Sequence, residues 1–129
     1  MNPMKLSRLS GLLLAVALPF VMTGNASASP LSTLTMTLTA PGGTPEVVVL
    51  ECDPASGSHP NAKRACEELL AADGDFDDLR GNHQMNCTME YRPVLATAHG
   101  VWDGEPLMWE QEFANNCTKL TATGAVFDF

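Results

Sequence analysis

Basic residues are scarce in this sequence: seven lysines and arginines stand against fifteen aspartates and glutamates, which gives a net charge of −8. A strongly acidic surface repels the phosphates of a nucleic-acid backbone, so we expect no nucleic-acid partner. The hydrolase motifs G-x-S-x-G and H-E-x-x-H are absent. No C-x-x-C pair occurs and the three histidines are scattered, which argues against a zinc site. We therefore expect a protein that is not an enzyme and needs no cofactor or metal.

Long hydrophobic runs are missing after residue 22. Before it, two basic residues precede a short apolar run over residues 11–22, and Ala26-Ser27-Ala28 follows. This order is typical of a secretory signal, and the run is shorter than the roughly 20 residues of a membrane span. We predict a signal peptide over residues 1–28 and a secreted, extracellular domain over residues 29–129 without a membrane anchor. An uncleaved amphipathic anchor is the alternative.

Cysteine is present four times, always after residue 28. An even number of cysteines in a small exported domain predicts two disulfides, for which three pairings are possible. The most local pairing joins Cys52 to Cys66 and Cys87 to Cys117.

The first half of the domain contains signals for two strands and a helix. Alternation of Leu34, Met36 and Leu38 with threonines predicts a half-buried strand, and VVVL within residues 46–52 predicts its hairpin partner. Composition predicts a loop over residues 53–61. Apolar residues then recur at helical spacing from residue 62 to the Asp73-Gly74 stop, with Asn61 as the expected cap.

A second, short helix is expected from Asp75, where it would bury Phe76 and Leu79. The acidic stretch DGDFDD resembles the opening of a calcium loop, but its sixth position is Asp78 instead of glycine and its twelfth is Gln84 instead of glutamate. A solvated helix end is the simpler interpretation, and a calcium-dependent structural domain remains an alternative.

Three strands are predicted after residue 90. Residues 91–102 form the first, and the Asp103-Gly104 turn leads to a return strand with Leu107 and Trp109 on one face. Residues 124–129 are expected to form the last strand. Strands on both sides of a helix predict an α+β domain with an antiparallel sheet whose one face the helix covers.

The segment RGNHQMNCTMEYRP, residues 80–93, shows neither the helical nor the strand periodicity of apolar residues. It is also long for a connection in so small a domain. Such loops are usually functional or disordered, and a cysteine argues against disorder. Cys87 would anchor it through Cys117 on the far side of the sheet, Thr88 is stiff, and Pro93 restrains the chain. Met89 would then stand out between anchors, where it could fill an apolar pocket.

An anchored, extended loop is what a protease inhibitor needs. Such a loop loses little conformational entropy when it binds the protease. If the chain on both sides of the peptide bond that the protease cleaves stays anchored, the two cut ends cannot separate. The pattern alone also fits a surface loop whose Met89 folds back onto the sheet.

The segments VVVLEC, SGSHP, ACEELLAADGDFDDL, NCTMEYRPVLATAHGVWDG, WEQEFANNC and VFDF occur in this order. On these segments the chain resembles the Streptomyces subtilisin inhibitor family of secreted serine-protease inhibitors. The resemblance implies five antiparallel strands with one main and one short helix, disulfides Cys52–Cys66 and Cys87–Cys117, and a homodimer formed through the sheets.

The resemblance also implies a site. The reactive bond would be Met89–Glu90, the protease would contact Asn86, Cys87, Thr88 and Tyr91, and Asn115 and Pro93 would support the loop. Thr88 stands where proline is common in the family, Arg92 replaces an acidic residue, and Glu90 adds a negative charge after the bond. We predict inhibition of subtilisin-like and chymotrypsin-like serine proteases. A secreted module that uses the same loop on a non-protease partner is the alternative.

Overall fold

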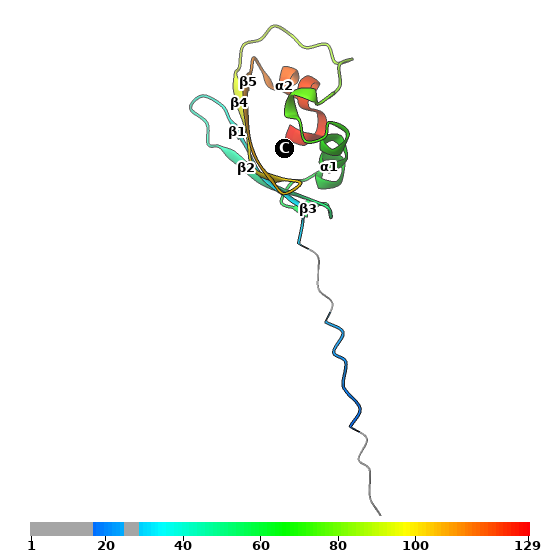
Figure 1. The fold of residues 1–129 in the computed structure, drawn as a ribbon. Coiled ribbons are helices and arrows are strands. Elements are labelled where there is room, and N and C mark those ends of the chain that lie inside the picture. Colours follow the sequence, from blue (N-terminus) through cyan, green and yellow to red (C-terminus); the bar gives the residue numbers. More distant parts are fainter. Residues whose placement is uncertain (1–16, 25–28) are drawn as a thin grey trace, which may run out of the picture.

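The computed structural model describes residues 17–24 and 29–129. The predicted signal segment falls largely outside these residues. From Ser32 on, the chain forms a five-stranded antiparallel sheet, and all its helical segments pack on one face of that sheet (Figure 1). This confirms the α+β prediction. Within the described part of the chain, the helices are too short and too polar to cross a membrane.

The sheet has the strand order β3-β2-β1-β4-β5, so the first long strand lies at its centre. Every neighbouring pair is antiparallel. The strands are β1 (Ser32–Thr39), β2 (Glu46–Cys52), β3 (Ser56–Gly57), β4 (Val94–Trp102) and β5 (Glu105–Phe113).

Strand β1 shows why the sheet has one covered face. Its even-numbered residues Leu34, Met36 and Leu38 are buried, while its threonines lie on the outer face. Met36 pairs with Val48 on β2 and with Ala98 on β4, so the register places inward residues side by side. The alternation seen in the sequence is confirmed because side chains along a strand point to opposite faces.

Strand β3 lies where composition predicted only loop. Its two residues pair with Leu50 and Glu51 at the edge of the sheet. Gly57 has φ +96°, and a Cβ atom there would collide with the carbonyl of Val49. The loop prediction is wrong at this point because glycine lets the backbone approach β2 closely.

Helix α1 (Ala62–Ala71) is the predicted main helix and buries Ala65, Cys66 and Leu69 against the sheet. The Cys52–Cys66 disulfide ties it to the end of β2. Asn61 occupies the N-cap position but its side chain makes no capping bond, so that prediction is wrong. Its backbone N–H instead donates to Nδ1 of His59 over 3.0 Å.

The predicted stop after α1 and the short helix that follows are both confirmed. Gly74 adopts φ +75° and its N–H donates to the carbonyl of Leu69. The 3₁₀ helix η1 (Phe76–Asp78) then begins, with Asp75 accepting from the N–H of Asp77. Phe76 and Leu79 are buried as expected.

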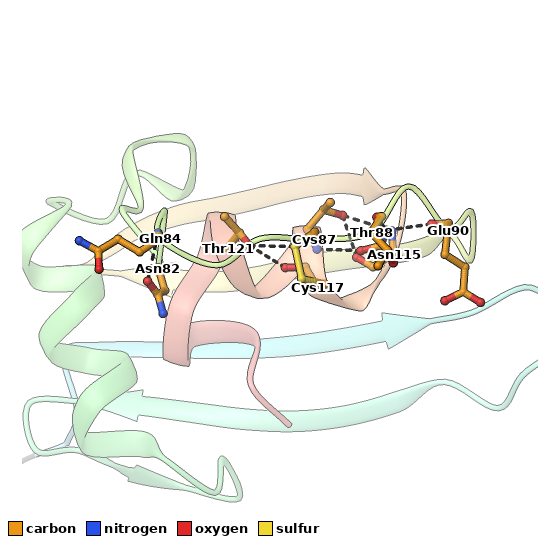
Figure 2. The surroundings of a disulfide bond; sticks show 9 residues. Asn82, Gln84, Cys87, Thr88, Glu90, Asn115, Cys117 and Thr121 are labelled. Carbon is orange, nitrogen blue, oxygen red and sulfur yellow. Dashed lines mark hydrogen bonds between the residues drawn. A yellow bond between two sulfur atoms is a disulfide. The ribbon is translucent and has the colours of Figure 1, made fainter.

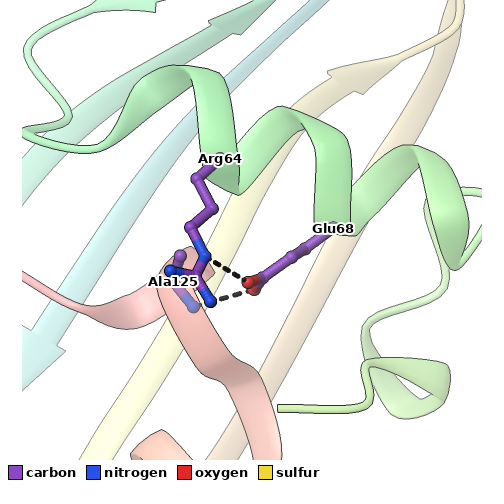
Figure 3. Close-up of polar contacts among 3 residues, drawn as sticks. All are labelled: Arg64, Glu68 and Ala125. Carbon is purple, nitrogen blue, oxygen red and sulfur yellow. Dashed lines mark hydrogen bonds and ion pairs between the residues drawn. The ribbon is translucent and has the colours of Figure 1, made fainter. Parts of the chain in front are cut away.

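The end of the chain is helical, and the predicted last strand over residues 124–129 is wrong. Helix α2 (Asn116–Thr123) leads into the 3₁₀ helix η2 (Gly124–Phe127). Three consecutive residues of η2, from Ala125 to Phe127, are buried between α1 and the sheet. Glu68 on α1 holds this segment: its carboxylate accepts from the N–H of Ala125 over 2.8 Å and pairs with Arg64 (Figure 3).

Candidate functional site

The candidate site is the segment between η1 and β4, residues 80–93, which forms neither helix nor strand and runs along helix α2 (Figure 2). Its start is pressed against that helix. Gly81 has φ +42°, and a Cβ atom at this position would collide with the carbonyl of Thr121. Only glycine combines this backbone conformation with this approach.

The Cys87–Cys117 disulfide, with a sequence separation of 30 residues, is the first anchor. Both predicted disulfide pairs are therefore confirmed. Cys117 lies in the first turn of α2 instead of across the sheet, so the expected place of this anchor is corrected. The hydroxyl of Thr121, one turn further along α2, donates to the carbonyl of Cys117 and lies 3.3 Å from the sulfur of Cys87.

Asn115 is the second anchor and connects the loop to the start of α2. Its Nδ2 donates to the carbonyl oxygens of Thr88 over 3.2 Å and of Glu90 over 2.8 Å (Figure 2). Its Oδ1 accepts from the N–H of Thr118 over 2.8 Å and so caps the helix. One buried side chain therefore fixes the backbone on both sides of Met89 and is itself fixed by a helix N-terminus.

Backbone pairing provides the third anchor. The N–H of Arg92 donates to the carbonyl of Ala114 over 2.8 Å. Pro93 follows and is half-buried, and the β4–β5 ladder begins with Val94 opposite Phe113. The chain after Glu90 thus leads into the start of β4, which pairs with both β1 and β5, and this limits its movement away from Asn115.

Met89 itself projects from this framework with 99% of its surface exposed, so it does not fold back onto the sheet. Asn86, Thr88 and Tyr91 are also exposed, whereas Cys87 is half-buried. The Glu90 carboxylate pairs with Arg92, with 2.9 Å between Oε1 and Nε. The predicted contact residues therefore surround one exposed apolar side chain on a restrained backbone.

In the described part of the chain, no three His, Cys, Asp or Glu residues lie together in a way that could hold a metal ion. Lys119 on α2 is buried, and this desolvation lowers its pKa, whereas nearby Asp128 and Glu46 act to raise it.

Sequence reasoning missed several residues that hold the loop: Gly81, Ala114, Thr118 and Thr121. Thr118 had a visible signal, because Asn115 followed three residues later by threonine can form a reciprocal cap, and here Thr118 Oγ1 accepts from the N–H of Asn115. Ala114 acts through its backbone carbonyl, Gly81 through a close approach to α2 and Thr121 through its hydroxyl, and no local sequence pattern points to these long-range contacts with the loop.

The structure is that of a small disulfide-bonded α+β domain, with helices on one face of its sheet and an exposed loop tethered by a disulfide. Comparison with known proteins identifies the family. A model described as subtilisin inhibitor-like matches residues 27–115, so the chain belongs to the subtilisin inhibitor-like family. This is a family of protease inhibitors, and the chain is therefore an inhibitor of this type and not an enzyme.

Relatives with assigned functions support the same placement. Protease inhibitor SIL-V1/SIL-V4 of Streptomyces netropsis is 47% identical over 92 residues, which cover 70% of this chain and 84% of that protein. A probable subtilase-type protease inhibitor of Streptomyces avermitilis is 45% identical over 116 residues, covering 83% of this chain and 81% of that protein.

A solved structure shares the fold. A chain from the crystal structure of Streptomyces caespitosus sermetstatin in complex with Bacillus licheniformis subtilisin superposes with a TM-score of 0.63 at 29% identity. The superposition covers 75% of this chain and 97% of that chain.

Proposed function

We propose that this protein inhibits serine endopeptidases of the subtilisin type by binding in the cleft as a substrate does, with Met89–Glu90 as the reactive bond. The observation that carries the proposal is Asn115, whose amide holds the carbonyls of Thr88 and Glu90 while Met89 between them is almost fully exposed. The family membership and the solved complex of a relative with subtilisin support it.

The geometry accounts for inhibition instead of digestion. A protease that cuts after Met89 creates two ends, but Asn115 holds the carbonyl of Thr88 before that bond and the carbonyl of Glu90 after it. The Cys87–Cys117 disulfide retains the first end, and the pairing of Arg92 with Ala114 retains the second. The new amine therefore stays beside the acyl group, so re-formation of the bond competes with hydrolysis.

Specificity would come from the exposed side chain. Met89 is unbranched and apolar and suits the apolar main pocket of subtilisin-like and chymotrypsin-like enzymes. Trypsin-like enzymes select a basic residue at this position. Asn86, Cys87, Thr88 and Tyr91 would lie along the cleft beside it, and Pro93 would support the loop from behind.

The test is a titration of subtilisin with purified protein, followed by mass spectrometry of the mixture. Stoichiometric loss of activity, with at most slow cleavage confined to Met89–Glu90, is the expected result. A Met89→Lys variant should gain inhibition of trypsin, and a Met108→Lys variant on the outer face of the sheet should not. Rapid digestion at Met89–Glu90 without inhibition would overturn the proposal.

Two further features belong to this proposal. Residues 1–28 would be removed as a secretory signal, so that the inhibitor acts outside the cell. N-terminal sequencing of exported protein should then begin at Ser29, and retention of the segment would contradict the assignment.

The second feature is a homodimer formed through the outer face of the sheet. That face carries the β1 threonines together with exposed Val47, Val101 and Met108. The reactive loop lies over α2 at the other side of the sheet, so both copies could bind a protease.

A further inference from the structure

The four methionines of residues 29–129 differ widely in exposure. Met36 is fully buried in the core, Met85 is 37% exposed, Met108 is 88% exposed and Met89 is 99% exposed. All cysteines in the described part of the chain are tied up in disulfides. Oxidants react first with accessible sulfur, so the thioethers of Met89 and Met108 are the first targets.

Met89 differs from Met108 in where it lies. Its side chain has almost no contact with the rest of the protein, while the backbone on both sides is held by Asn115. A change at its sulfur therefore breaks no contact of the fold and leaves the loop in place. Such a change therefore affects only the binding of a partner that contacts Met89.

We propose that Met89 is an oxidative modification site through which peroxides switch this inhibitor off. The inference rests on the proposed function, because it assumes that Met89 enters the protease. In the reaction the thioether sulfur attacks one peroxide oxygen, the O–O bond breaks, and an S–O bond forms. Sulfur loses two electrons, and hydrogen peroxide is reduced to water.

Oxidation removes the apolar character with which Met89 would fill the protease pocket. Methionine sulfoxide is polar and carries a strong hydrogen-bond acceptor, whereas the proposed pocket is apolar. Burying that oxygen without a partner is unfavourable, so inhibition should weaken by at least about tenfold. The anchors at Cys87, Asn115 and Arg92 are untouched, so the fold should persist.

Exposure also makes the change reversible. Methionine sulfoxide reductases act on accessible sulfoxides, with a separate enzyme for each epimer at sulfur. Two thiols supply the electrons: the S–O bond breaks, water leaves, and a disulfide forms. Met89 stands free of the surface and offers such an enzyme an open approach.

The experiment compares the exported protein with its Met89→Leu and Met108→Leu variants, each before and after hydrogen peroxide. Catalase removes the oxidant before subtilisin is added, so the protease itself is not modified. Peptide mapping by mass spectrometry follows each methionine, and circular dichroism follows the fold. A portion of each oxidised sample is treated with both reductases and a dithiol, and unoxidised protein receives the same treatment as a control.

Oxidised wild type and the oxidised Met108→Leu variant should lose inhibition at the rate at which Met89 gains oxygen, without loss of structure. The Met89→Leu variant should inhibit equally before and after peroxide, and the reductases should restore the wild type. Unchanged inhibition by protein fully oxidised at Met89 would overturn this inference alone. Absence of inhibition by the untreated wild type would instead overturn the proposed function, and the inference with it.

Discussion

At the scale of single residues, Asn115 has two structural roles, capping α2 and holding the loop, which substitutions can separate. Its Oδ1 caps α2 and its Nδ2 braces the loop. Serine at this position retains a capping oxygen but cannot donate to both carbonyls, whereas alanine lacks both functions. The two variants therefore distinguish loss of the brace from loss of the helix cap.

We expect Asn115→Ser to unfold at nearly the wild-type temperature but to be cleaved at Met89–Glu90 at least about tenfold faster by subtilisin, because two bonds that hold the cut ends are lost. Asn115→Ala should be cleaved as fast and should also lose about 1 kcal/mol of unfolding free energy with the cap. Thermal unfolding and timed mass spectrometry measure the two effects. Slow cleavage of both variants would show that the disulfide alone holds the loop.

The pair Glu90–Arg92 is a second residue-scale feature, in which an arginine neutralises the carboxylate next to the proposed reactive bond. Both side chains are exposed, so the pair contributes little to folding. When a protease covers the loop, however, an unpaired carboxylate would have to lose water without compensation.

Arg92→Gln should therefore weaken inhibition by about two- to fivefold at low salt, and less at high salt. The double variant Glu90→Gln/Arg92→Gln should recover most of the loss. Arg64→Gln, which breaks a similar ion pair on α1, is the matched control and should leave inhibition unchanged. Inhibition constants at two ionic strengths measure this, and equal losses in the single and double variants would contradict it.

At the scale of elements, helix α2 shows why part of the fold could not be predicted from the sequence. Strands β1, β4 and β5 and helix α1 were predicted because their buried residues are apolar and recur with the right period. The buried residues of α2 are Lys119 and Thr123, which no hydrophobic pattern reveals. In η2 three consecutive residues are buried, and the alternation of Ala125 and Phe127 resembled a strand although Val126 between them is buried too.

The site was predictable only in part, for a similar reason. The loop, its cysteine and its proline are visible as a local pattern, so a tethered exposed methionine could be inferred. The brace is not local, since Asn115 is 25 residues from Glu90. Its role followed from the family resemblance, because periodicity carries no information about a contact between a loop and a distant helix cap.

Lys119 leads to a prediction about α2. Burial lowers its pKa from the ordinary 10.5, although Asp128 and Glu46 oppose this. The charged form is therefore less favourable in the folded chain than in the unfolded chain, and removing the charge should stabilise the fold. Lys119→Met keeps the buried stem and should raise the unfolding free energy at pH 7 by about 1 kcal/mol, whereas Lys63→Met on the exposed side of α1 should not.

The sign of the pH dependence follows from the same shift. Between the lowered pKa and 10.5 the unfolded chain binds more protons than the folded chain, so the wild type gains stability as the pH rises through this window. The advantage of Lys119→Met should thus shrink between pH 7 and about pH 10. Urea denaturation at several pH values measures it. A destabilised variant at pH 7 would mean that Asp128 and Glu46 outweigh the cost of burial.

At the scale of the whole molecule, charge and apolar surface act against each other in the proposed dimer. Without residues 1–28 the chain has five basic and fifteen acidic residues, so each copy carries a net charge of −10. Two such copies repel each other, while Val47, Val101 and Met108 on the outer face favour contact. Salt screens the repulsion and leaves the apolar contact, so the dimer should tighten as ionic strength rises.

Val101→Glu should shift the equilibrium between dimer and monomer toward the monomer. It places a further carboxylate on each of two facing sheets, and the dissociation constant should rise by at least about tenfold. Leu70→Glu is the control, because Leu70 is equally apolar and 62% exposed but lies on helix α1, away from the outer face of the sheet. Sedimentation velocity at two salt concentrations measures both variants. The loop runs along α2, and its anchors at Cys117, Asn115 and Ala114 lie at the start of that helix and just before it, away from Val101, so the Val101→Glu monomer should still inhibit with one protease bound per chain. A dimer that weakens with Leu70→Glu and not with Val101→Glu would place the interface on the helices.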